Sequence, residues 1–151
     1  MKIKKIISGG QTGADRAALD FAIKNNIPHG GWIPKGRLTE EGHLSKDYHL
    51  KETKSSNYEE RTEKNVVDSD GTMIFYYEEL SGGSLLTYRL TLKHKRPVKL
   101  INLDVVQSLD EIQNWITENK IGTLNIAGLR ASYCPTIYED VERFLGKLFK
   151  E

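Results

Sequence analysis

Short apolar segments alternate with amphipathic segments along most of this chain. Four apolar runs have the length and composition of buried strands, at residues 3–8, 71–77, 98–103 and 123–128. Between and after them, apolar residues recur every three or four positions, as in amphipathic helices, over residues 14–24, 85–94, 109–118 and 137–148. Strands that alternate with helices pack as a parallel sheet covered on both faces. With a further short strand within residues 28–34, the pattern predicts an α/β, Rossmann-like, doubly wound fold with a mainly parallel sheet of about five strands.

Residues 34–69 interrupt this alternation with a long polar stretch. It is rich in both charges and has no clear apolar period before residues 58–67, which fit a short helix. A structureless loop of this length is uncommon inside a compact domain and is often functional when it is ordered. We expect an ordered excursion, held to the domain by residues such as Tyr48 and Leu50, rather than a disordered insertion. No repeat or low-complexity linker marks a second domain, so residues 1–151 are expected to form one domain.

Composition narrows the class of protein. The chain has 151 residues, of which 38% are hydrophobic and 28% charged, as in ordinary globular domains. A net charge of +1 gives no basic excess, which argues against a nucleic-acid partner. No apolar run approaches the ~20 residues of a membrane span, and the first residues lack a signal-peptide pattern. The single cysteine, Cys134, cannot form an internal disulfide. We therefore expect a cytoplasmic protein without a membrane partner.

Three turns rich in small residues follow predicted strands. The first is "SGGQTGAD" (residues 8–15), the second "EELSGGSLLT" (residues 78–87) and the third "GLRASYCP" (residues 128–135). In an open parallel sheet all strand-to-helix turns lie at the carboxyl edge, where ligands bind near the reversal of strand order. Glycines let the backbone approach a ligand closely, and free N–H groups at a helix start suit a phosphate. The three turns therefore predict a site for a phosphorylated ligand, although each one alone also fits a plain tight connection.

Charged residues near these turns sharpen the prediction. Lys35 and Arg37 follow the short second strand, and Arg61 lies in the predicted helix of the excursion. Arg16 in the first turn of a helix opposes the helix dipole unless an anion or a carboxylate compensates it. Asp70 precedes a strand, and three roles are open to it. It could bind a sugar hydroxyl, bind a metal together with Asp68, or only form a turn, which is the commonest role of such residues.

No established fingerprint settles the ligand. None of the turns matches the dinucleotide-binding pattern G-x-G-x-x-G or the phosphate loop G-x-x-x-x-G-K-[ST]. With four histidines and one cysteine, a protein zinc site is not expected. The residues that we expect around the ligand are Ser8, Gly9, Gly10, Gln11, Thr12, Asp15, Arg16, Lys35, Arg37, Arg61, Asp70, Gly82, Gly83, Ser84, Thr87, Gly128, Arg130 and Ser132.

Five stretches together resemble a known family. They are "GGQTGADRAALDFAI", "GGWIPKGR", "YHLKETKSSNYEERTEKNVVDSDGT", "SGGSLLT" and "NIAGLRAS", in this order. They resemble the molybdenum-carrier family, within the SLOG group of Rossmann-like domains that includes the lysine-decarboxylase-like proteins. The resemblance implies a site for a nucleotide or a nucleotide-derived ligand, including molybdenum cofactor, a pterin that carries a phosphate. It also implies assembly as a homo-oligomer, commonly a dimer.

Two positions depart from the pattern of that family. We expect a cysteine where Ile33 stands, which argues against thiolate chemistry there, and a proline where Leu129 stands. The related cytokinin-activating enzymes, which cleave the N-glycosidic bond of a nucleoside monophosphate, carry a glutamate where this chain has Arg89. Arg89 cannot act as the acid or base that such a cleavage needs.

Three functions therefore remain open. The first is a carrier or sensor that binds a phosphorylated nucleotide or pterin. The second is a hydrolase acting on the glycosidic or phosphate bond of a nucleotide, with Asp15, Asp68 or Asp70 as the available carboxylates. The third is a non-catalytic protein that binds a partner through aromatic residues such as Trp32 and Tyr58, with glycines that only turn the chain.

Overall fold

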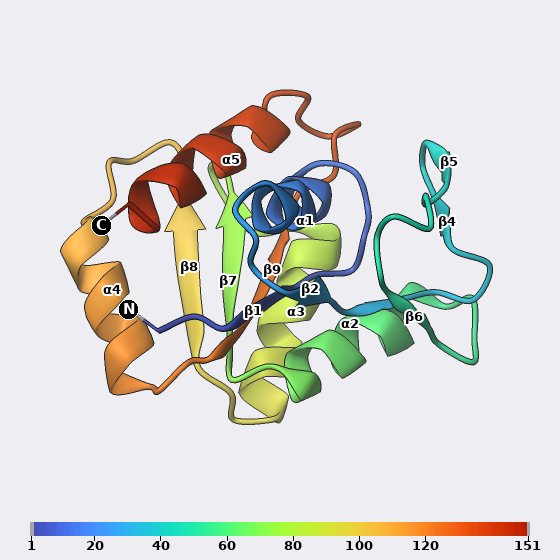
Figure 1. The fold of residues 1–151 in the computed structure, drawn as a ribbon, viewed down its shortest axis with the longest axis horizontal. Coiled ribbons are helices and arrows are strands. Elements are labelled where there is room, and N and C mark those ends of the chain that lie inside the picture. The colour runs from blue at the N-terminus through green and yellow to red at the C-terminus, as the bar shows by residue number, and fades with distance from the viewer. Residues whose placement is uncertain (1, 151) are drawn as a thin grey trace.

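Five parallel strands form the central sheet in a computed structural model that describes residues 2–150 (Figure 1). They are β1 (Lys5–Ile7), β2 (His29–Gly30), β7 (Gly71–Tyr76), β8 (Val98–Asn102) and β9 (Thr123–Gly128). Their spatial order is β2-β1-β9-β7-β8, and each neighbouring pair is parallel. The predicted Rossmann-like fold is confirmed.

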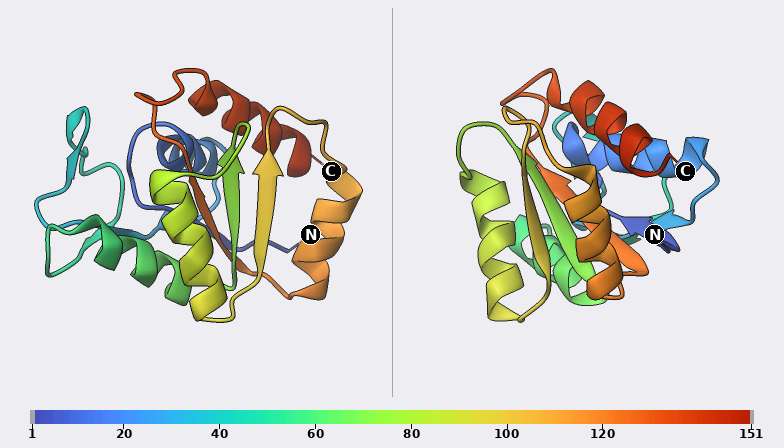
Figure 2. Two further views of the ribbon diagram at one scale, coloured as in Figure 1. Left: turned by 180° about the vertical axis from the view of Figure 1, so that it is seen from behind. Right: turned by 90° about the vertical axis from the view of Figure 1, so that its left-hand side faces the viewer.

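Helices cover both faces of this sheet, as the edge-on view in Figure 2 shows. They are α1 (Ala14–Lys24), α2 (Tyr58–Asp68), α3 (Gly82–Lys93), α4 (Leu109–Glu118) and α5 (Ile137–Leu148). The helices α1, α4 and α5 pack on one face, and α2 and α3 on the other. Helix α3 begins three residues earlier than predicted, because Ser81 and Ser84 cap its first turn. The Ser84 hydroxyl donates to the Ser81 carbonyl at 2.7 Å.

The two faces of the sheet differ in polarity. The main core lies between the sheet and α1, α4 and α5, where strand residues such as Phe75, Leu124 and Ile126 are fully buried. Asn125, between two of these core positions, points to the opposite face, and its side-chain amide donates to the Thr72 hydroxyl at 3.2 Å. Alternation along a strand sends successive side chains to opposite faces. Buried polar groups therefore gather on the α2–α3 side.

The excursion is ordered and has its own small core. Strand β3 (Trp32–Ile33) pairs with β6 (Lys51–Glu52), and β4 (Leu38–Thr39) forms a hairpin with β5 (Gly42–His43). Its apolar residues pack on α1 in a cluster that we call the second core, made of Leu19, Ile33, Leu44 and Leu50 with Tyr48 at its side. The observed α2 agrees closely with the helix expected at residues 58–67.

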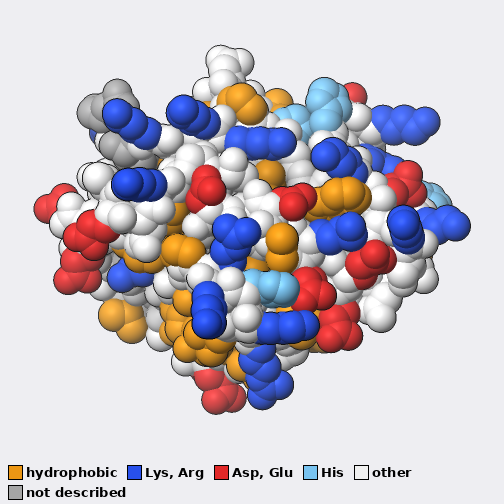
Figure 3. Space-filling view, turned by 90° about the horizontal axis from the view of Figure 1, so that it is seen from below, with side chains coloured by type: hydrophobic (Ala, Val, Ile, Leu, Met, Phe, Trp, Pro, Cys, Tyr) orange, Lys and Arg blue, Asp and Glu red, His pale blue; other side chains and the backbone are white. Residues whose placement is uncertain are grey.

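The surface carries mixed charge. Basic and acidic side chains are interspersed over the face shown in Figure 3, which lies at the lower side of Figure 1. None of the helices within residues 2–150 is long and apolar enough to cross a membrane. The expectations about nucleic acid, cellular compartment and dimer formation stay predictions.

Candidate functional site

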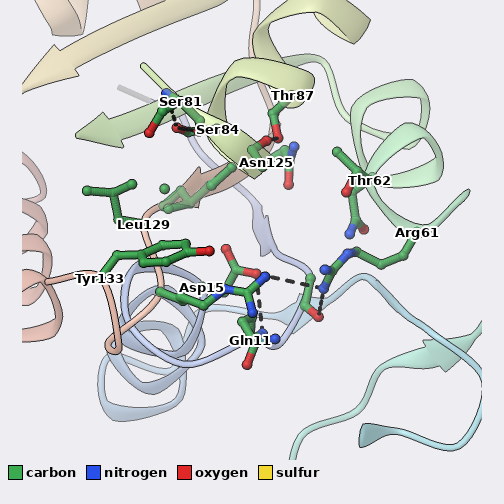
Figure 4. A pocket seen from close by; sticks show the side chains of 17 residues that line it. Gln11, Asp15, Arg61, Thr62, Ser81, Ser84, Thr87, Asn125, Leu129 and Tyr133 are labelled. Carbon is green, nitrogen blue, oxygen red and sulfur yellow. Dashed lines mark hydrogen bonds and ion pairs between the residues drawn. The ribbon is translucent and has the colours of Figure 1, made fainter. Parts of the chain in front are cut away.

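The three predicted turns meet around one pocket at the carboxyl edge of the sheet (Figure 4). The pocket has about 700 Å³ of free space, part of it open to solvent. Its lining comes from the first turn and α1 (Gly9, Gln11, Asp15), from α2 (Arg61, Thr62, Asn65), from the second turn and α3 (Ser81, Gly83, Ser84, Thr87), and from β9 and the third turn (Asn125, Ile126, Ala127, Gly128, Leu129, Arg130, Tyr133).

Strand order explains why these turns converge. The chain leaves β1 through α1 toward β2 at one edge, and leaves β7 through α3 toward β8 at the other edge. Strand β9 lies between β1 and β7, so the three turns surround the point where the direction of winding reverses. Gly128 permits this close arrangement, because a Cβ there would lie 2.6 Å from the Phe75 carbonyl oxygen and 2.7 Å from the Ala14 Cβ.

A buried ion pair forms the floor of the pocket. Arg61, only 8% exposed, donates from Nη1 to the Gly9 carbonyl at 2.6 Å and lies 4.0 Å from Asp15 Oδ2. The same carboxylate oxygen accepts from the Gln11 backbone N–H at 3.3 Å. Burial raises the pKa of Asp15 to about 6, although Arg61 and the Gln11 N–H act in the opposite direction. Asp15 therefore titrates near neutral pH inside the pocket.

The start of α3 forms a second wall, in which the Ser84 and Thr87 hydroxyls donate to the Ser81 and Gly83 carbonyls at 2.7 and 2.8 Å. Ser81, Ser84 and Thr87 face the pocket together with Gly83 (Figure 4). A Cβ added at Gly83 would meet nothing within 4 Å, so the backbone here borders open space. The first N–H groups of a helix have no partner within the helix and carry its positive dipole end. This wall therefore suits a phosphate.

Arg130 and Tyr133 line the pocket on the side of the third turn, and Tyr58 lies close to Arg130. The Arg130 guanidinium lies over the Tyr133 ring at 5.5 Å and over the Tyr58 ring at 5.8 Å. Tyr133 is 72% exposed and Tyr58 is 43% exposed. Arg130, whose side chain is 31% exposed, is more accessible to a ligand than the buried Arg61.

Half of the predicted site residues line this pocket, and the others lie elsewhere. Those in the lining are Gly9, Gln11, Asp15, Arg61, Gly83, Ser84, Thr87, Gly128 and Arg130. Gly82 and Ser132 are in the converging turns without lining the pocket, and Ser8 supports the first turn by donating to the Asp15 carbonyl at 2.9 Å.

Four of the predicted residues hold the excursion or the first turn instead. Arg37 donates to the carbonyls of Leu44, Ser45, Tyr48 and Leu50 at 2.8–3.3 Å. The Lys35 backbone N–H bonds to the Ser55 carbonyl at 3.0 Å. Arg16 donates to the Gly10 carbonyl at 3.3 Å, and Gly10 itself faces the second core.

Asp70 and Asp68 lie far from where we expected them. The Asp70 carboxylate accepts from the backbone N–H groups of Gly122 and Thr123 at 3.0 and 2.8 Å. Both partners precede or begin β9, so Asp70 joins strands at the amino edge, opposite the pocket. Asp68 accepts from the Trp32 indole N–H at 2.6 Å. Their placement near the carboxyl edge was wrong, because both precede β7 rather than follow it.

Several lining residues were missed by the sequence analysis. Asn125 had a usable signal, since a polar residue stands inside an otherwise apolar strand. Thr62 and Asn65 lie one and four positions after Arg61 on α2, and the face of α2 that meets the pocket becomes known only from packing. Tyr133 had no signal, because the sequence does not show whether an aromatic residue in a loop is packed or exposed.

Comparison with known proteins assigns the family. A model of the circularly permutated YpsA SLOG family matches residues 6–149. The chain belongs to this family. A crystal structure at 1.45 Å, described as a putative molybdenum carrier protein from Syntrophus aciditrophicus SB, is 50% identical to this chain. The match covers 98% of this chain and 96% of that chain, with a TM-score of 0.94. A search of the curated proteins found no match. The predicted resemblance is confirmed.

The two departures from the expected family pattern fall in different places. Ile33 is 1% exposed in the second core, so that position is not part of the pocket. Leu129 lines the pocket, and its carbonyl oxygen accepts from the Ala14 N–H at 3.2 Å. The third turn therefore accepts from the first N–H of α1, and the start of α3 faces the pocket beside Asp15 of α1.

Proposed function

We propose that this protein of the circularly permutated YpsA SLOG family binds a small phosphorylated nucleotide, or a ligand derived from one, as a carrier or sensor. The convergence of three turns on one polar pocket carries the proposal. The phosphate is placed at the start of α3, against Gly83 and Ser84. Arg130 supplies a counter-charge, because a guanidinium forms strong charge-assisted hydrogen bonds to phosphate. The exposed Tyr133 ring offers a face on which a base or pterin stacks.

The name of the relative extends this proposal to molybdenum cofactor as a cargo. The donors at the start of α3 fit the phosphate of that pterin as well as they fit a nucleotide phosphate. Within residues 2–150, no three His, Cys, Asp or Glu side chains are grouped so that they could hold a metal ion. In this proposal the protein's residues bind the phosphate and the ring, and the pterin itself holds the metal.

A matched pair of glycine substitutions tests the proposal. Gly83→Val puts a side chain into the proposed phosphate position, where its Cβ meets nothing within 4 Å, and Gly146→Val adds the same group at a position of α5 that is open in the same sense. Binding of nucleoside monophosphates, nucleoside diphosphates and phosphorylated pterins is measured by calorimetry for both variants and the parent. Gly83→Val is expected to weaken binding at least tenfold, with Gly146→Val unchanged. Equal affinity of the two variants would remove α3 from the site.

A second candidate function rests on Asp15. A carboxyl group with a pKa of about 6 in a ligand pocket suits general acid–base chemistry. Arg89, which stands where related nucleotide hydrolases carry a glutamate, is exposed on α3 and does not line the pocket. In a hydrolase of the glycosidic bond, protonated Asp15 would donate to the departing base while water attacks the sugar carbon. In a hydrolase of the phosphate bond, it would donate to the departing sugar oxygen while water attacks the phosphorus.

Product analysis tests the hydrolase. Nucleoside monophosphates are incubated with the parent and with Asp15→Asn, and free base, nucleoside and phosphate are separated by chromatography. A hydrolase releases one of these from the parent, and the rate falls at least a hundredfold in Asp15→Asn. Bound ligand recovered intact from the parent would leave the carrier or sensor as the function.

A further inference from the structure

The Glu40 carboxylate occupies an anion-binding site between the first and third turns. Glu40 lies at the tip of the β4–β5 hairpin, which is labelled at the outer end of the excursion in Figure 1. Its Oε1 accepts from the Thr12 hydroxyl and from the Ser132 backbone N–H, the latter at 3.1 Å. Its Oε2 accepts from the Ser132 hydroxyl at 2.7 Å and lies 4.0 Å from Arg130 Nη1.

These donors form the set that usually surrounds a phosphate. Two hydroxyls, one backbone N–H and one guanidinium all point at the same carboxylate, and phosphoryl oxygens accept from such groups in the same way. Thr12, Arg130 and Ser132 were expected from the sequence to bind a phosphorylated ligand. The structure gives their hydrogen bonds to the protein's own carboxylate. The sum of these interactions outweighs burial and holds the pKa of Glu40 below its usual range, so Glu40 is an anion at neutral pH.

The site adjoins the proposed ligand pocket through Arg130. Arg130 lines the pocket and also faces Glu40, so one guanidinium serves both places. Gln11 joins them on the other side, because it lines the pocket while its side-chain carbonyl accepts from the N–H groups of Thr12 and Glu40, each at 3.0 Å. A ligand seated in the pocket therefore reaches this site with a second anionic group.

Beyond the bond from the Glu40 N–H to the Gln11 side chain and the burial of Thr39, little structure opposes the release of Glu40. On this hairpin Leu38 is 55% exposed, and a Cβ at Gly42 would meet nothing within 4 Å. The base of the hairpin is held independently by Arg37, which bonds to four backbone carbonyls of the excursion. A small outward shift of the tip together with the Glu40 side chain therefore frees these four donor groups without unfolding the excursion.

We propose that Thr12, Arg130 and Ser132 form a second anion subsite, which Glu40 holds closed until a phosphoryl group displaces it. The proposal rests on the proposed function in one respect: the displacing group belongs to the ligand of the adjacent pocket. That ligand then carries two anionic groups, as a nucleoside diphosphate or a dinucleotide does. A tethered carboxylate competes at an effective concentration of mM or above, so the closed subsite binds free phosphate weakly.

Phosphate titration of Glu40→Ala tests this, with Glu41→Ala as the matched control. Glu41 is its exposed neighbour on the same hairpin, and the described hydrogen bonds and ion pairs include none of its side chain. Inorganic phosphate is titrated calorimetrically into the parent and both variants, and sites are counted. We expect Glu40→Ala to bind phosphate at one site more than the parent. The affinity of that additional site should be at least tenfold stronger than that of the closed subsite in the parent. Glu41→Ala should match the parent.

The number of sites separates this proposal from the proposed function. If the pocket binds phosphate and Glu40 closes a second subsite, the parent shows one site and Glu40→Ala two. If the pocket does not bind phosphate, the parent shows no site and Glu40→Ala shows one. The subsite is then supported and the proposed function is not. Equal counts in the parent and Glu40→Ala overturn the subsite whatever the parent binds.

Hydrogen exchange on the parent provides a test that no substitution can confound. Saturating pyrophosphate is expected to speed exchange at residues 38–43, because the tip loses its contacts to Thr12 and Ser132. Unchanged or slower exchange there would mean that Glu40 stays in place, and would overturn the proposal.

Discussion

Single side chains at this site have roles that follow from burial rather than from residue type. The sequence predicts both Arg61 and Arg37 as phosphate ligands. Arg61 instead pairs with Asp15 and with the Gly9 carbonyl, and Arg37 bonds to carbonyls of the excursion. A buried guanidinium with fixed partners loses them if it turns to a ligand. Arg130, whose side chain is 31% exposed between two tyrosines, keeps its donors available.

Asp15 predicts a pH dependence of stability. Its pKa is raised to about 6 in the folded protein, chiefly by burial, so the unfolded chain ionises first. The folded state therefore loses stability as the pH rises from about 4 through 6, by on the order of 2 to 3 kcal/mol. Asp15→Asn removes this titration. Urea denaturation from pH 4 to 8 should show the free energy of unfolding of the variant rising relative to that of the parent by that amount. A difference that does not depend on pH would contradict the raised pKa.

At the scale of elements, the sequence predicted strands and helices well and the site only in part. Periodicity determines α1, α4 and α5 to the residue, because a 3.6-residue repeat is local information. The carboxyl-edge turns were also predictable, since the edge follows from strand direction. Asp70 was misplaced because it lies just before β7, and the amino edge faces away from the pocket. Glu40 was missed entirely, because its partners are 28 and 92 residues away in the chain.

Gly10 shows how the first turn holds the excursion as well as the site. Its φ is +76°, and a Cβ would lie 2.9 Å from Leu50 Cδ2 and 3.0 Å from Leu44 Cδ2. Gly10→Ala is therefore expected to cost roughly 2 to 4 kcal/mol, from backbone strain plus overpacking of the second core.

A second glycine isolates the two contributions to that cost. Gly36 also has a left-handed φ, of +95°, but a Cβ there meets nothing within 4 Å. Gly36→Ala should then lose only the strain, about 1 kcal/mol. Urea denaturation of both variants measures the difference, and equal losses would show that the second core yields to the added methyl group.

At the scale of the whole molecule, one carboxylate on α1 bonds to two elements that are far apart in the chain. Asp20 Oδ1 accepts from the Tyr48 hydroxyl of the excursion at 2.6 Å, and Oδ2 accepts from the Tyr138 hydroxyl of α5. Helix α1 thus connects the excursion on one side with the C-terminal helix on the other. Since the excursion carries Glu40 and leads into α2 with Arg61, its attachment positions two of the groups that surround the candidate site.

Removal of this carboxylate should loosen the excursion more than its local contacts suggest. Asp20→Ala leaves two partly buried hydroxyls without their charged acceptor, at an expected loss on the order of 2 to 4 kcal/mol. Asp47→Ala, which removes an exposed carboxylate next to Tyr48, controls for charge and should change stability little.

Burial and the Asp20 hydrogen bond raise the pKa of Tyr48 to about 12, so this contribution to stability is complete below pH 10 and is lost as the pH rises toward 12. Urea denaturation at pH 7 and at pH 11 measures the difference in free energy of unfolding between Asp20→Ala and the parent. This difference should be smaller at pH 11. An equal difference at both pH values would mean that Asp20 acts through packing and not through the two tyrosine hydroxyls.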